Sequence, residues 1–114
     1  MTRVRVLVVD DVDLFRTGLS AALRAAGFDI CGLAAEAEGA VTAAEELLPD
    51  VVVLDILMPG LSGLEVVEKI LAVSPSSRVI LLTASESVED LLEGIRAGAR
   101  GYLVKDTAFE GLAE

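Results

Sequence analysis

The feature that most constrains the fold of this chain is an alternation between short apolar runs and longer segments with helical spacing. Each run is rich in β-branched residues and stops at a polar residue or a turn, which is typical of a strand. The expected strands are Val4–Val9, Phe28–Ala34, Val51–Leu54, Val79–Leu82 and Tyr102–Val104. The third is almost purely apolar, as expected when helices cover both faces of a sheet.

The segments between these strands predict helices. Apolar residues recur at helical spacing in the first of them, at Leu14, Leu19, Ala22, Leu23 and Ala26. Asp13 is the expected N-cap of this helix and Gly27 its expected C-terminal cap. The other helices are expected over Glu38–Leu48, Leu64–Val73 and Val88–Ile95, with a short, truncated last helix from about Thr107.

Strands that alternate with helices at this spacing imply right-handed crossovers and a parallel sheet with helices on both faces. The sequence therefore predicts a doubly wound α/β fold of five strands, with residues 1–114 as one domain. In such sheets ligands bind beyond the carboxyl ends of the strands.

Charge and composition exclude several functions. The formal charge is −10, so the domain repels phosphate backbones and is not expected to bind nucleic acid by itself. No apolar run approaches the roughly 20 residues that span a bilayer. Acidic residues interrupt the first apolar stretch where a signal peptide needs a cleavage site, so a cytoplasmic location is expected.

The chain has no histidine and one cysteine, Cys31. These counts exclude zinc sites of the usual type, Ser-His-Asp triads and a phosphohistidine on this chain. Cys31 is expected to be a small buried residue.

Polar residues follow four of the five strands. Asp10 and Asp11 follow the first, Asp55 the third, Thr83 the fourth and Lys105 the fifth. Because parallel strands end at the same edge, these side chains should share one pocket. Three adjacent carboxylates need a cation to offset their repulsion, and all-oxygen ligands favour Mg²⁺. A carboxylate beside such an ion can act as a nucleophile toward phosphorus.

Each of these residues has an ordinary structural explanation when taken singly. An acidic pair after a strand is more typical of a solvated turn or a helix cap. Thr83 is an unremarkable strand-end residue and Lys105 an unremarkable surface charge. Only their joint placement favours a phosphoryl-transfer site.

Four segments together resemble the signatures of the receiver domain of two-component response regulators, a CheY-like family, and the resemblance covers essentially the whole chain. The segments are Val8-Val9-Asp10-Asp11, Leu54-Asp55-Ile56-Leu57-Met58-Pro59-Gly60, Leu82-Thr83-Ala84 and Gly101-Tyr102-Leu103-Val104-Lys105. The resemblance implies the flavodoxin-like and CheY-like strand order 2-1-3-4-5.

The resemblance also implies roles for individual residues. Asp55 would be the phosphoacceptor, and Asp10, Asp11 and Asp55 would hold Mg²⁺ with the backbone carbonyl of Leu57. Thr83 and Lys105 match the phosphate-contacting pair. Thr83 and Tyr102 match a switch in which the aromatic ring turns inward, although Tyr102 is equally typical of an ordinary half-buried strand residue.

The implied function is that of a bacterial phosphoprotein in a phosphorelay, not an enzyme beyond its own aspartyl phosphorylation and dephosphorylation. A sensor histidine kinase would be the donor. A homodimer could form through the fourth helix, fifth strand and fifth helix, or through the first and fifth helices. Phe15-Arg16-Thr17-Gly18-Leu19 resembles regulators of transcription with a LuxR-type helix-turn-helix output domain.

Three other functions stay open at this point. Asp11 and Asp13 after a strand resemble the acid pair of haloacid-dehalogenase-type phosphatases. A flavodoxin-like or dinucleotide-binding module would share the topology, but no Gly-rich loop follows the first strand. A receiver that works without phosphorylation is the third.

Overall fold

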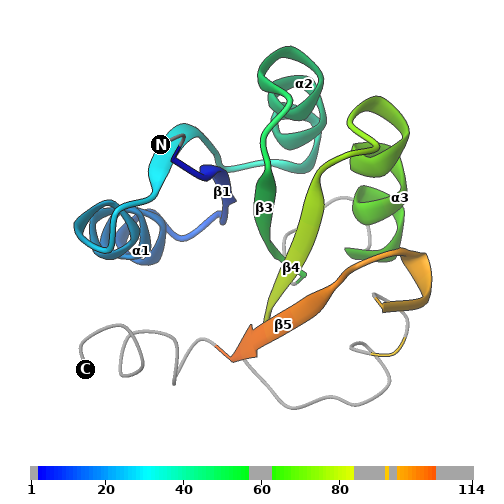
Figure 1. Ribbon diagram of the computed structural model, residues 1–114. Helices are drawn as coiled ribbons and strands as arrows, with labels where there is room; N and C mark the ends of the chain where they lie inside the picture. The colour runs from blue at the N-terminus through cyan, green and yellow to red at the C-terminus, as the bar shows by residue number, and fades with distance from the viewer. Residues whose placement is uncertain (1–2, 57–62, 84–91, 93–94, 105–114) are drawn as a thin grey trace.

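The computed structural model describes residues 3–56, 63–83, 92 and 95–104 of the chain. Its centre is a five-stranded sheet in which every pair of neighbouring strands is parallel, in the order β2-β1-β3-β4-β5 (Figure 1). The strands are β1 (Arg5–Val9), β2 (Asp29–Ala34), β3 (Val51–Asp55), β4 (Arg78–Thr83) and β5 (Gly101–Val104). This confirms the predicted doubly wound fold, its strand number and its strand order.

Three helices are α1 (Asp13–Ala25), α2 (Ala37–Leu47) and α3 (Gly63–Val73), each within one or two residues of its expected bounds. Most of the expected helix over Val88–Ile95, and all of the last helix from Thr107, lie outside the described residues. Among the helices that the structure describes, none combines the length and apolar character needed to cross a membrane.

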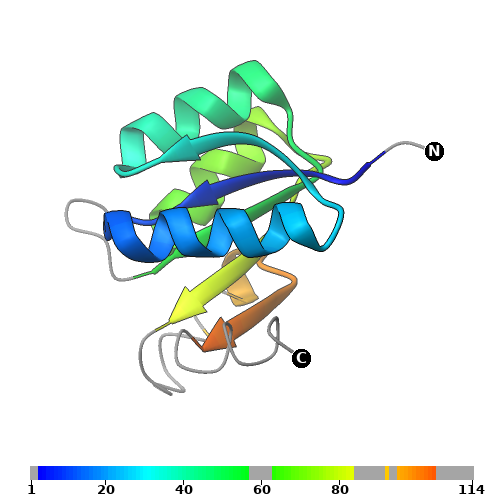
Figure 2. The ribbon, with the colours of Figure 1, turned by 90° about the vertical axis from the view of Figure 1, so that its left-hand side faces the viewer.

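The helices form layers on both sides of the sheet (Figures 1 and 2). One face packs against α2 and α3 in the larger apolar cluster, which includes Leu7, Val52 and Leu81 from the strands and Ala40 and Ile70 from the helices. The other face packs against α1 in a smaller cluster.

The smaller cluster corrects one expectation about α1. Leu14 is 85% exposed and does not join the buried face of the helix. Leu19 and the partly buried Phe15 and Leu23 form that face instead, at a regular spacing of one helical turn, against strand residues such as Val8. The buried face of α1 therefore begins at Phe15 and not, as the sequence predicted, at Leu14.

The N-terminus of α1 also differs from the prediction. Val12, with extended backbone angles, is the N-cap, and Asp13 is the first helical residue. The prediction that Asp13 caps the helix was wrong because the carboxylate of Asp10 already accepts a hydrogen bond from the Val12 N–H, at 2.9 Å, and fixes the turn one residue earlier.

The C-terminus of α1 confirms the predicted role of Gly27. After the C-cap Ala26, Gly27 adopts a φ of 101°. Its N–H donates to the Arg24 carbonyl and the Phe28 N–H to the Leu23 carbonyl, both at 3.0 Å. This is the Schellman arrangement, which needs a residue that tolerates positive φ.

Strand β2 lies at one edge of the sheet and contains an irregularity. Val6 pairs with Ile30 but Leu7 pairs with Gly32, so Cys31 is an extra residue in the ladder. Cys31 is partly exposed, which corrects the expectation of a buried residue. At Gly32 a β-carbon would lie 2.7 Å from Leu47 Cδ1 and 3.2 Å from Leu7 Cδ1, so any side chain there would require these leucine side chains to move.

Candidate functional site

The strand register explains why acids distant in sequence meet at one edge. Val9 and Leu54 are paired across β1 and β3, so Asp10 and Asp55 follow neighbouring positions at the carboxyl ends. One carboxylate oxygen from each of Asp10, Asp11 and Asp55 lies within 4.8 Å of the other two. We call these three residues the acid cluster.

Burial differs among the members of the acid cluster. Asp10 is 0% exposed and Asp55 is 3% exposed, whereas Asp11 faces solvent. Two buried carboxylates and one accessible one, all offering oxygen ligands, suit a hard divalent cation that approaches from the solvent side and keeps some of its water. Within the described residues the chemistry of the donor set therefore fits Mg²⁺.

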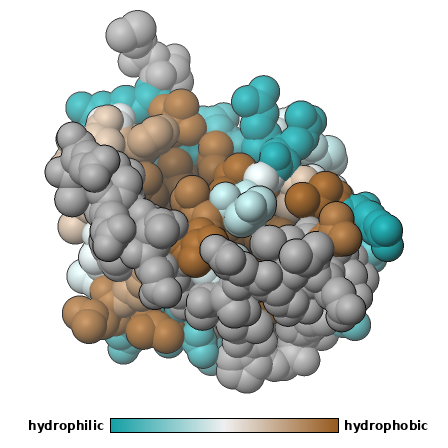
Figure 3. Space-filling view, turned by 90° about the horizontal axis from the view of Figure 1, so that it is seen from below, coloured by the Kyte–Doolittle hydropathy of each residue, from teal (hydrophilic) through white to brown (hydrophobic). Residues whose placement is uncertain are grey.

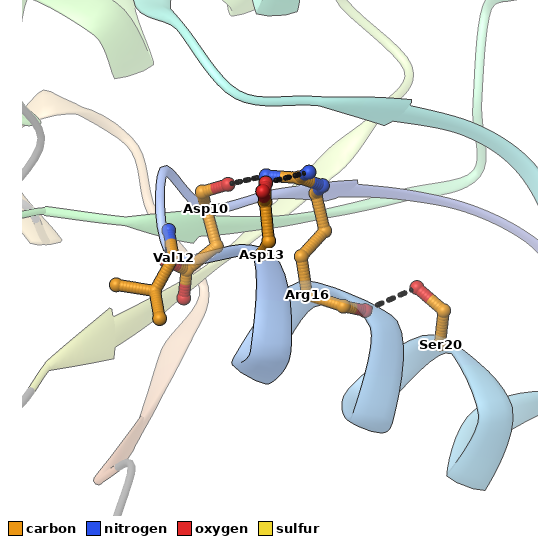
Figure 4. Close-up of polar contacts among 5 residues, drawn as sticks. All are labelled: Asp10, Val12, Asp13, Arg16 and Ser20. Carbon is orange, nitrogen blue, oxygen red and sulfur yellow. Dashed lines mark hydrogen bonds and ion pairs between the residues drawn. The ribbon is translucent and has the colours of Figure 1, made fainter.

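The backbone around Asp10 is held on three sides. Its N–H donates to the Ala34 carbonyl at 3.0 Å, which extends the pairing of β1 with β2 by one residue. Its carboxylate accepts from the Val12 N–H, and its carbonyl accepts from Arg16 Nη1 at 2.7 Å (Figure 4). The turn between β1 and α1 is thus fixed by one contact to β2, by one contact within the turn itself and by one contact to α1.

Thr83 lies beside the acid cluster in the sheet. It is the last residue of β4 and is 1% exposed. Asp55 pairs with Leu82, and the Ile56 N–H donates to the Leu82 carbonyl at 3.1 Å, so Thr83 is one residue beyond the partner of Asp55. Thr83 therefore lies at the same carboxyl edge of the sheet as the acid cluster.

Tyr102 lies on β5 opposite Leu81 and is 49% exposed. Val104 pairs with Thr83, so β5 also ends at the edge where the acids gather. Leu57 and Lys105, the other two residues expected at the site, lie outside the described residues.

Apolar side chains are exposed on the face of the molecule seen in Figure 3. Exposed apolar residues also lie near the carboxyl ends of β1 and β2, where Val12 is 48% exposed, Leu14 85% and Leu33 47%. An open groove of about 300 Å³ lies elsewhere, between α2 and α3, lined by Glu38, Val41, Thr42 and Lys69, and it contains no member of the acid cluster.

Arg16 is a site residue that the sequence did not identify. Its side chain is 16% exposed and bonds both to Asp10 and to the Asp13 carboxylate. The spacing of Asp13 and Arg16 on a helix indicates an ion pair. The contact to the Asp10 carbonyl depends on the conformation of the turn, which no sequence pattern specified.

Comparison with known proteins decides the family. Residues 6–114 match the response regulator receiver domain. The chain belongs to the response regulator receiver domain family. Receiver domains of response regulators are signalling switches, generally not enzymes in the classical sense.

Relatives of this receiver domain include transcriptional regulators and chemotaxis proteins. It is 42% identical over 112 residues to the response regulator GacA of Pseudomonas viridiflava, covering 97% of the chain and 51% of GacA. It is 35% identical over 101 residues to the chemotaxis protein CheY of Thermotoga maritima, covering 89% of the chain and 84% of CheY.

A solved structure supports the predicted likeness to LuxR-type regulators. The two-component response regulator of the LuxR family from Aurantimonas has a TM-score of 0.84 at 28% identity, covering 98% of this chain and 86% of that one. The chain spans about half the length of the first curated regulators that it matches.

Proposed function

We propose that this receiver domain accepts a phosphoryl group on Asp55, with Mg²⁺ bound by Asp10, Asp11 and Asp55. The observation that carries the proposal is the 4.8 Å clustering of their three carboxylates at the ends of β1 and β3. Like charges this close are unfavourable unless a cation offsets them. Membership of the receiver family supports the same assignment.

The chemistry follows from the groups at the site. An oxygen of the Asp55 carboxylate attacks phosphorus and forms a P–O bond, while the P–N bond of a phosphohistidine breaks and its electron pair stays on the imidazole nitrogen. A bound Mg²⁺ would offset charge on the phosphoryl oxygens during this transfer. The Thr83 hydroxyl would donate to one of these oxygens and Lys105 would pair with another.

The donor would be a sensor histidine kinase, and the backbone carbonyl of Leu57 would be a further metal ligand. Thr83 and Tyr102 would report phosphorylation, with the half-exposed ring turning inward as the active surface becomes populated. Three further expectations stay predictions. The domain could form a homodimer through the fourth helix, β5 and the fifth helix, or through α1 and the fifth helix. It could relay the signal to an output domain for transcription, and its location could be cytoplasmic.

Intact-mass measurement after incubation with acetyl phosphate and Mg²⁺ tests the proposal. We expect a gain of one phosphoryl group in the wild type, and none in Asp55→Asn. Asp29→Asn is the matched control, because Asp29 is exposed and lies at the start of β2, at the opposite end of the sheet from the acid cluster. Labelling should persist in this variant.

Adding Asp11→Asn to these variants separates the alternatives. Labelling that survives in Asp55→Asn but is lost in Asp11→Asn would favour the phosphatase-like use of Asp11 and Asp13. A wild type that gains no mass while remaining folded would favour a receiver that works without phosphorylation.

A further inference from the structure

We propose that Arg16 is a positioning residue of the acid cluster, which holds the turn that carries Asp10 and Asp11 in the conformation that binds a divalent cation. This inference rests on the proposed function of the same cluster. It adds a basic residue on α1 whose role is to set the affinity for the metal without contacting it.

The guanidinium of Arg16 connects both ends of the turn between β1 and α1. Nη1 donates to the Asp10 carbonyl at 2.7 Å, and Nη2 donates to the Asp13 carboxylate (Figure 4). The planar guanidinium can make both bonds at once in a fixed geometry, which a lysine ammonium cannot reproduce. The Arg16 side chain is 16% exposed, so its bond to the Asp10 carbonyl is partly shielded from competing water, whereas the Asp13 carboxylate is 87% exposed.

The position of Asp11 depends on this turn. Asp11 lies between Asp10 and Val12 in the chain. The bond from Arg16 fixes the backbone of Asp10, and the hydrogen bond to the Asp10 carboxylate fixes the backbone of Val12. Because Asp11 itself is exposed, few neighbours restrict its side chain, and the backbone must bring its carboxylate toward Asp55. Loss of the Arg16 contact should therefore loosen Asp11 first.

Arg16 is in turn held by its own helix. The buried hydroxyl of Ser20 donates to the Arg16 carbonyl at 2.7 Å, one turn further along α1 (Figure 4). The apolar face of α1, with Phe15 and Leu19, packs on the sheet. The helix therefore supplies a rigid base from which the guanidinium reaches the turn.

The sign of the effect distinguishes positioning from simple electrostatics. A cation close to a metal site repels the metal, so removal of the Arg16 charge alone should strengthen Mg²⁺ binding. If Arg16 instead positions the ligands, its removal should weaken binding, since residues that orient metal ligands typically change affinity by about 10–100-fold. The two explanations predict opposite changes in Kd.

Calorimetric titration with Mg²⁺ of the wild type, Arg16→Ala, Arg16→Lys and Arg24→Ala tests the inference. Arg24 is the matched charge control, because it lies exposed in the last turn of the same helix. We expect Kd to rise about tenfold or more in Arg16→Ala. Arg16→Lys, which keeps the charge but not the planar group, should also bind more weakly than wild type. Arg24→Ala should stay within about twofold of wild type because salt screens distant charges.

Each result decides a different question. A wild type that binds no Mg²⁺ would overturn the proposed function and this inference with it. A wild type that binds Mg²⁺, with Arg16→Ala binding equally or more tightly, would overturn only the role of Arg16. Thermal unfolding without Mg²⁺ checks that each variant is folded, and should Arg16→Ala be unfolded, Arg16→Lys decides by the same comparison.

Discussion

The carboxylate of Asp10 shows how this fold accommodates a charged side chain at 0% exposure. Removing a carboxylate from water costs several kcal/mol unless hydrogen bonds and nearby cations offset it. The Val12 N–H bonds directly to this carboxylate, and the Arg16 guanidinium lies against the carbonyl of the same residue. A divalent cation would add the largest favourable contribution, which is why we regard the arrangement as a binding site rather than a structural contact.

A second residue-scale feature is the thiol of Cys31. Burial raises its pKa above the ordinary value, although the charge of Arg5 acts in the opposite direction. A raised folded-state pKa contributes stability that is fully present below the unfolded pKa and is lost as pH rises through the folded one. The thiolate is the reactive form, so the native thiol should also be slow to alkylate.

We therefore predict that the stability of the wild type relative to Cys31→Ala falls as pH increases from about 8 to about 10. Urea unfolding of both proteins at each pH measures this difference. The Cys31→Ala reference removes the contribution of every other group that titrates in the same range. A difference that stays constant with pH would contradict the prediction.

At the scale of an element, the end of α1 depends on one backbone conformation. Gly27 has a φ of 101°, and no atom lies within 4 Å of the β-carbon that a substitution would add. The cost of Gly27→Ala therefore comes from the backbone alone and should be about 1–2 kcal/mol. Gly39, inside α2, has the same free space without the positive φ.

Gly39→Ala should consequently stabilise the domain, by about 0.5–1 kcal/mol, because alanine restricts the unfolded chain and favours the helix. The pair of variants is best compared by the midpoint of urea unfolding. Equal effects of the two substitutions would show that the φ of Gly27 does not matter.

The elements also show what could be predicted from the sequence. The strands and the meeting of Asp10, Asp11 and Asp55 were predictable, because apolar runs that end at acids must align in a parallel sheet. The exposed Leu14 and the extra residue at Cys31 were not, because helix rotation and strand register are decided by packing between distant segments. Arg16 was missed for the same reason, since its main partner is a backbone carbonyl.

At the scale of the whole molecule, the main electrostatic feature is the formal net charge of −10. Self-repulsion of a strongly charged compact state lowers stability and is screened by salt. We predict that the melting temperature rises between about 20 mM and about 500 mM NaCl. Each kcal/mol by which salt reduces the repulsion should raise the melting temperature by roughly 2–8 °C for domains of this size range.

This melting series requires a chelator, so that divalent cations do not bind at the acid cluster. Choline chloride serves as a second salt, because it screens charge without a small metal cation. A melting temperature that is flat or falls in both salts would show that net charge does not limit stability.

The irregular pairing in β2 bears on how the domain behaves at high concentration. An edge strand with a regular ladder offers free backbone groups to which another chain can add, and that is a common start of aggregation. The extra residue at Cys31 interrupts the regular repeat in the middle of β2, and such irregularities are one device that discourages another chain from adding to an edge strand. We therefore expect the β2 edge to resist pairing with a second copy of the chain.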